Sequence, residues 1–84
     1  MPCFEIVRVV DDLTLVNAES RRCRYESTRA DDMSAGYYIV LWPRTIVRPQ
    51  YDRDAKFFGP FASRLDATDA IKDAIVSYSL YETE

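Results

Sequence analysis

A strand that leads through a short turn into a helix is the feature that most constrains this fold. In the segment FGPFASRLDA, residues 58–67, Pro60 lacks a backbone donor and therefore limits further strand pairing. Ser63 follows at a position where its hydroxyl group can cap the first turn of a helix. The segment predicts a strand that ends near Phe61 and a helix that begins after Ser63.

The sequence after Ser63 predicts one C-terminal amphipathic helix that runs to about Tyr78 or Leu80. Acidic side chains fall on the opposite side from the apolar ones, where they are exposed and where the first two complement the helix dipole. The acidic residues are Asp66, Asp69 and Asp73, and the apolar positions at helical spacing are Ala67, Ala70, Ile71, Ala74, Ile75 and Tyr78.

The first sixty residues have the composition of β-strands. Residues 4–10 and 13–16 are separated by Asp11 and Asp12, which favours a hairpin. In residues 21–28, charged side chains alternate with other residues, as in a strand with one solvent-exposed face. Residues 37–42, YYIVLW, predict a central strand that ends at Pro43 and pairs antiparallel with residues 56–61. We therefore expect an α+β fold: an antiparallel sheet of four to five strands, in meander-like order, with one C-terminal helix packed on one face.

The length of 84 residues and a hydrophobic content of 48% indicate a single small domain, residues 1–84, that buries a core. Acidic residues near the N-terminus do not fit a signal peptide, and no apolar stretch approaches the roughly 20 residues of a membrane span. These features favour a cytoplasmic protein with no membrane partner.

The absence of histidine restricts the chemistry of this chain. It excludes Ser-His and Cys-His nucleophile pairs and Cys/His zinc sites. We interpret Cys3 and Cys23 as reduced thiols in strand-like segments, where free cysteine usually behaves as a small hydrophobe. An enzyme that uses Cys23 or a carboxylate is a third hypothesis. The acidic pairs at 31–32 and 52–54 lack the spacing of a calcium loop, so we assign no catalytic residue, cofactor or metal site.

Positive charge is concentrated in the middle of the chain. Residues 21–53 contain seven arginines and four acidic residues, whereas the whole chain has a net charge of −3. Arginines beside aromatic rings can pair with phosphates and stack on bases, but they can also form only a solvated strand face. The candidate binding residues are Arg22, Arg24, Trp42, Arg44, Arg48 and Tyr51.

The aromatic content suggests a second surface. Six tyrosines, four phenylalanines and one tryptophan exceed what one short helix covers, and one helix leaves the other face of the sheet bare. Each Tyr or Phe side chain can bury roughly 150–250 Å². We therefore expect an open sheet face that is buried in a homodimer or against a protein partner, unless that face is polar.

The segment FFGPFASRLDA is similar to the strand-turn-helix of the SPOR peptidoglycan-binding domain, in which a Gly-Pro-Phe turn precedes a Ser-containing cap. It also resembles a turn in small cyanobacterial proteins. The SPOR likeness is confined to this segment, because the chain has neither a first strand-helix unit nor a strand after its helix. Neither resemblance implies a functional residue.

The sequence therefore favours a non-enzymatic binding or regulatory module of a bacterial or phage cytoplasm, dimeric, acting through an open sheet face or the arginine-rich middle. The first alternative is single-stranded nucleic-acid binding through Arg22, Arg24, Arg44 and Arg48, which the net charge disfavours. The second is an inhibitor of phage type that imitates phosphates with the acidic helix face.

Overall fold

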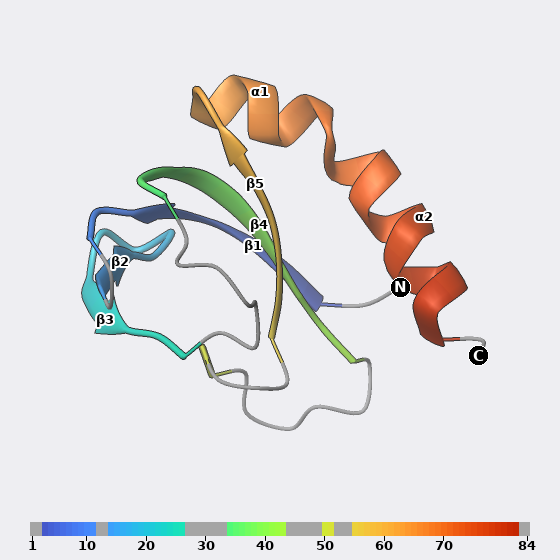
Figure 1. The fold of residues 1–84 in the computed structure, drawn as a ribbon, viewed down its shortest axis with the longest axis horizontal. Helices are drawn as coiled ribbons and strands as arrows, with labels where there is room; N and C mark the ends of the chain where they lie inside the picture. Colours follow the sequence, from blue (N-terminus) through green and yellow to red (C-terminus); the bar gives the residue numbers. More distant parts are fainter. Residues whose placement is uncertain (1–2, 12–13, 27–33, 44–49, 52–54, 83–84) are drawn as a thin grey trace.

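Strand β1 (Cys3–Val9) is the centre of a five-stranded antiparallel sheet in the computed structural model, which describes residues 3–11, 14–26, 34–43, 50–51 and 55–82. It pairs with β2 (Thr14–Val16) and with β4 (Gly36–Trp42). The edge strands are β3 (Arg22–Arg24), next to β2, and β5 (Lys56–Phe61), next to β4, which gives the order β3-β2-β1-β4-β5 (Figure 1).

The predicted hairpin and the antiparallel pairing of residues 37–42 with 56–61 are confirmed. The meander-like order is wrong, because β4 pairs with β1 and not with β3. The third strand is also shorter than residues 21–28. Its regular part is Arg22–Arg24, and positions 27 and 28 lie outside the described residues.

A β-bulge interrupts the pairing of β4 with β5 at Pro60. Tyr37 is opposite Phe61 and Ile39 is opposite Phe58, so the two residues Gly59 and Pro60 face the single residue Tyr38. The strand therefore continues through Pro60 and ends at Phe61, as the sequence predicts.

Ser63 caps the first helix as predicted: its hydroxyl oxygen accepts a hydrogen bond of 3.1 Å from the backbone N–H of Asp66. The helical region is nevertheless two helices, α1 (Arg64–Asp69) and α2 (Ile71–Glu82), so the expectation of one helix is wrong. The break is at Ala70, whose N–H is shared between the carbonyl groups of Asp66 and Ala67.

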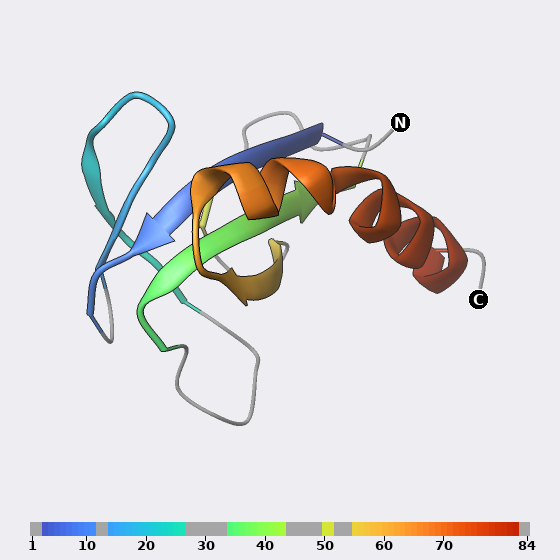
Figure 2. The same cartoon turned by 90° about the horizontal axis from the view of Figure 1, so that it is seen from above.

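One face of the sheet contacts the helices. Ile39 and Leu41 of β4 are fully buried in a cluster with Ala67 of α1 and with Ala74 and Tyr78 of α2. Figure 2 shows α1 lying over β1 and β4, with α2 continuing beyond the end of β4. We call the face that carries Ile39 and Leu41 the helical face.

The opposite face, which we call the concave face, is buried without a helix. Tyr25, just after edge strand β3, lies 5.8 Å from Phe57 of edge strand β5, measured between ring centroids, so the curved sheet brings its two edges together. The expected bare sheet face is therefore absent from the described part of the fold. The cluster on this side contains Val7, Val9, Leu15, Tyr25, Tyr38, Val40, Trp42 and Ala55.

Candidate arginine surface and pocket

A row of directly paired residues crosses all five strands on the helical face. In strand order its members are Arg22, Val16, Arg8, Tyr37 and Phe61, each the cross-strand partner of the next. Direct partners in an antiparallel sheet project their side chains to the same side. The row therefore places two arginines on the part of this face that is formed by β1, β2 and β3.

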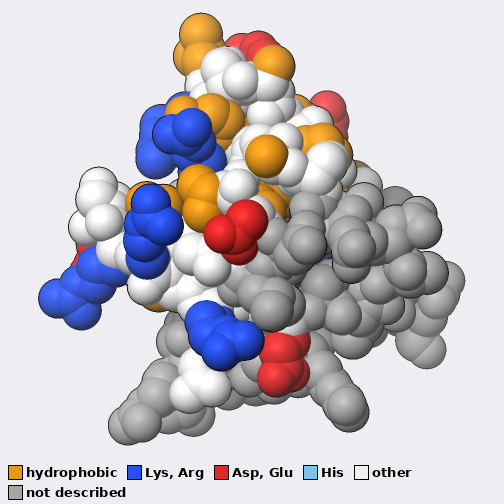
Figure 3. All heavy atoms as spheres, turned by 60° about the vertical axis from the view of Figure 1, so that its left-hand side comes forward, with side chains coloured by type: hydrophobic (Ala, Val, Ile, Leu, Met, Phe, Trp, Pro, Cys, Tyr) orange, Lys and Arg blue, Asp and Glu red, His pale blue; other side chains and the backbone are white. Residues whose placement is uncertain are grey.

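Two more arginines extend this row. Arg24 is opposite Thr14, two residues further along β3 than Arg22, so the alternation of the strand places it on the same face. Arg64, in the first turn of α1, has its Cζ atom 5.9 Å from the centre of the Tyr37 ring. We call Arg8, Arg22, Arg24 and Arg64 the arginine surface. Figure 3 brings the side of β2 and β3 forward and shows basic side chains with hydrophobic ones between them.

All four side chains of the arginine surface are exposed. Within the described residues, no carboxylate forms an ion pair with Arg8, Arg22 or Arg24. A guanidinium group presents several donors in a planar fork that matches a carboxylate or a phosphate. This surface therefore has the chemistry to bind an anionic partner.

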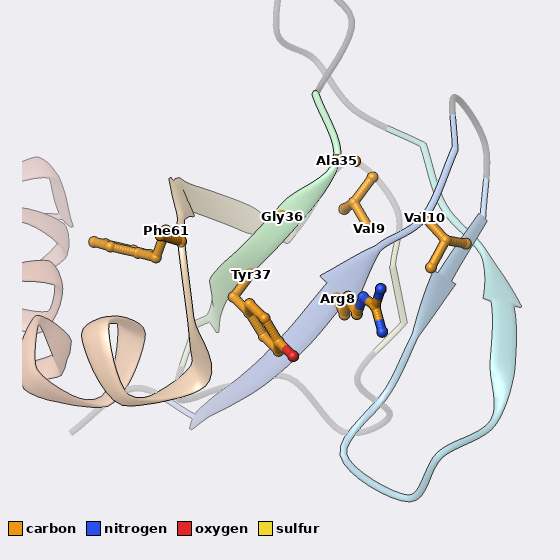
Figure 4. A pocket seen from close by; sticks show the side chains of 8 residues that line it. Arg8, Val9, Val10, Ala35, Gly36, Tyr37 and Phe61 are labelled. Carbon is orange, nitrogen blue, oxygen red and sulfur yellow. The ribbon is translucent and has the colours of Figure 1, made fainter.

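A pocket of about 500 Å³ lies beside the arginine surface. Arg8 and Tyr37 are neighbours in it, and Phe61 lies on the side of the helices (Figure 4). Small residues, Ala35 and Ala62, also line it, and the pocket is open to solvent. It thus joins one guanidinium group to a lining of mixed polar and apolar character that includes Tyr37 and Phe61.

The candidate binding residues predicted from the sequence do not form one surface. Arg22 and Arg24 lie together on the arginine surface, but Trp42 is only 3% exposed and donates a hydrogen bond of 2.7 Å from Nε1 to the carbonyl of Gln50. Its ring packs in the core and is not presented to a ligand. Tyr51 is half-buried beside Trp42, with 5.7 Å between ring centroids. Arg44 and Arg48 lie outside the described residues.

Two members of the arginine surface, Arg8 and Arg64, were not among the candidates predicted from the sequence. Arg8 is the only charged residue in IVRVV, and the buried Val7 and Val9 on either side of it already imply that it points to the opposite face. Arg64 has no such signal, because its position beside Tyr37 depends on how α1 meets the sheet. The acidic residues Asp66, Asp69 and Asp73 are exposed as predicted.

The thiols do not form a reactive group with other described side chains. Cys3 is exposed, and Cys23 is half-buried with its Sγ atom 3.7 Å from Nδ2 of Asn17. Neither thiol lines the pocket beside Arg8. In the described ranges no three Cys, Asp or Glu side chains lie together as a metal site would require.

The comparisons give no relative from which a function can be transferred. No protein-family model matches the chain, and neither the curated proteins nor the solved structures include a significant match. Among the described helices, none has the length and apolar character needed to cross a membrane.

Proposed function

We propose that this chain is a non-enzymatic binding module that uses the arginine surface to hold an exposed acidic segment of a partner protein. One observation carries the proposal: Arg8 and Arg22 lie in one cross-strand row, with Arg24 on the same face, and none of the three has an ion-pair partner among the described residues. Their guanidinium groups therefore remain available for carboxylates from outside.

Charge favours a short acidic segment over a nucleic acid. The chain has a net charge of −3, and Asp66, Asp69 and Asp73 are exposed on the helices. A long polyanion that extended beyond the arginine surface would meet these carboxylates and be repelled. Two of the aromatic rings are also poorly placed to stack on bases, because Trp42 is in the core and Arg64 already lies over Tyr37.

The structure changes the argument for a homodimer. The expected dimer required a bare apolar sheet face, whereas Val7, Tyr38 and Val40 on the concave face are fully buried. Two copies meeting through their arginine surfaces would bring like charges together, which is unfavourable. We therefore propose a different protein as the partner.

Binding of a fluorescein-labelled oligoglutamate peptide, followed by fluorescence anisotropy, tests this function. The double variant R22E/R24E should weaken binding about ten-fold or more, because two attractive contacts become repulsive. The control K72E makes the same kind of change at an exposed position on α2 and should alter affinity by less than about two-fold.

The proposal is overturned if the peptide does not bind, or if K72E weakens binding as much as R22E/R24E. A labelled oligothymidine strand serves as the competing ligand. Tighter binding of that strand, with a steep loss of affinity as salt rises, would favour the nucleic-acid alternative instead.

A further inference from the structure

We infer that the acidic segment binds as an additional strand on the outer edge of β3, with two carboxylates that are separated by one residue. This inference rests on the proposed function and specifies how its ligand is held. β3 ends the sheet beyond β2, and no other strand of the described residues lies outside it (Figure 1). Extended peptides can bind an exposed sheet edge through backbone hydrogen bonds, with alternate side chains giving specificity.

The hydrogen bonds of the β2–β3 hairpin indicate which backbone groups of β3 face outward. The N–H of Asn17 donates to the carbonyl of Arg21 at 2.9 Å, so these two residues form a hydrogen-bonded pair. Along an antiparallel ladder such pairs alternate with pairs that exchange no hydrogen bond. Cys23 is therefore bonded to β2, whereas the N–H and C=O groups of Arg22 and Arg24 point away from β2.

The outward backbone groups of Arg22 and Arg24 have no hydrogen bond with any described residue. The next outward N–H belongs to Glu26, and it already donates to the carbonyl of Tyr51 at 2.8 Å. At the other end, the turn that precedes β3 closes with a hydrogen bond of 3.0 Å from the N–H of Ser20. The open edge is therefore the strand itself, Arg22–Arg24.

The side chains of this edge select an acidic strand. Arg22 and Arg24 lie on one face, about 6.6 Å apart along β3. In a partner strand that pairs antiparallel, the residues directly opposite them are also separated by one residue and project to the same face. Carboxylates at those two positions would each face a guanidinium group. Two adjacent carboxylates would instead point to opposite faces of the sheet.

A second copy of the chain is a poor occupant of this edge. Two β3 strands paired antiparallel about Cys23 would place Arg22 of one copy opposite Arg24 of the other, and like charges directly opposite each other are destabilising. The other edge strand is less suited to pairing, because β5 contains Pro60, which has no N–H. Charge and backbone geometry therefore favour an acidic segment of a different protein at β3.

The test follows the backbone amide NMR signals of Arg22 and Arg24 while a peptide is added to the full chain. Acetyl-Ser-Asp-Val-Asp-Ser-amide should bind about five-fold or more tightly than acetyl-Ser-Asp-Asp-Val-Ser-amide, which has the same composition but adjacent carboxylates. The variant R22E/R24E should weaken binding of the first peptide about ten-fold or more, because both contacts become repulsive.

N-methylated forms of the first peptide test the backbone pairing. In the antiparallel arrangement both Asp residues exchange hydrogen bonds with β3, whereas the N–H of the central Val points away from it. A methyl group on the nitrogen of the second Asp should weaken binding about five-fold or more, because it removes a hydrogen bond at the edge. The same methyl group on the Val nitrogen is the matched control and should alter affinity by less than about two-fold.

The outcomes separate this inference from the proposed function. If oligoglutamate binds and R22E/R24E weakens it, but the two peptides of equal composition bind equally or not at all, the arginine surface is supported and the strand pairing is overturned. Methylation of Val that weakens binding as much as methylation of Asp also overturns the pairing. If oligoglutamate does not bind to the wild-type chain either, the inference and the proposed function both fail.

Discussion

The hydroxyl group of Tyr51 donates a hydrogen bond to the Oε1 atom of Glu5, a residue 46 positions earlier in the chain. The other carboxylate oxygen of Glu5 accepts a hydrogen bond of 3.2 Å from the backbone N–H of Ala18. Glu5 therefore connects three segments: the central strand β1, the turn between β2 and β3, and the short described segment at 50–51. This contact links the chain that follows β4 to the central strand on the concave face.

This contact predicts how stability changes in alkaline solution. Burial, with the nearby Glu5 carboxylate as the next cause, raises the pKa of Tyr51 well above the ordinary value for tyrosine. The unfolded chain ionises at this tyrosine first, so the stabilisation is complete below about pH 10 and is lost as the pH rises further. Denaturant unfolding at several pH values should show a steeper alkaline decline in the wild type than in Y51F.

The variant E5Q supplies the control for this prediction. It removes the negative charge, so the pKa of Tyr51 should move toward its ordinary value, which phenolate absorbance measures. Equal alkaline slopes in the wild type and Y51F would show that this tyrosine is not the group responsible.

Gly59 should not tolerate a side chain. Its φ angle is +147°, and a Cβ atom there would lie 2.7 Å from the carbonyl oxygen of Tyr37 and 3.0 Å from Cδ2 of Tyr38. We expect G59A to lower the free energy of unfolding by about 1–3 kcal/mol, measured by urea denaturation. The control K72A, at an exposed helical position, should change it by less than about 0.5 kcal/mol. A G59A variant as stable as the wild type would contradict the bulge geometry.

Local features of this fold are predictable from the sequence, whereas its curvature is not. The Ser63 cap and the strand at 37–42 follow from hydrogen-bonding capacity and from apolar runs, which are properties of neighbouring residues. The pairing of β4 with β1 and the approach of Tyr25 to Phe57 depend on sheet twist and on the long connection before β4. No local pattern encodes these contacts.

The same distinction applies to the candidate site. Arg22 and Arg24 are recognisable from strand alternation, and alternation also exposes Arg8 between Val7 and Val9. Trp42 was nominated because arginines are close to it in sequence, but its position in β4 places its ring on the concave face. Proximity along the chain is a weak guide to a surface, because successive residues of a strand point to opposite faces.

The cap at Ser63 should contribute measurably to stability. Its hydroxyl oxygen satisfies the N–H of Asp66, so S63A should lower the free energy of unfolding by about 1 kcal/mol. S63D should retain most of the stability, because aspartate caps equally well. S77A provides a matched control at an exposed position on α2 and should have almost no effect in thermal denaturation. Equal losses in S63A and S77A would argue against the cap.

A buried leucine should be equally costly to remove from either face of the sheet. Leu41 lies on the helical face and Leu15 on the concave face, and each has 0% exposure. L41A and L15A should each lower the free energy of unfolding by about 2–5 kcal/mol, because each removes buried methyl groups and leaves a cavity. A sheet with one bare face would instead lose stability only through L41A.

Leu65 provides an exposed control for the two buried leucine positions. It is 68% exposed on α1, so the same Leu-to-Ala change there removes little buried surface. L65A should change the free energy of unfolding by less than about 0.5 kcal/mol in the same urea experiment. If L15A behaved like L65A and not like L41A, the concave face would be open in solution, and the apolar surface that a homodimer needs would again exist.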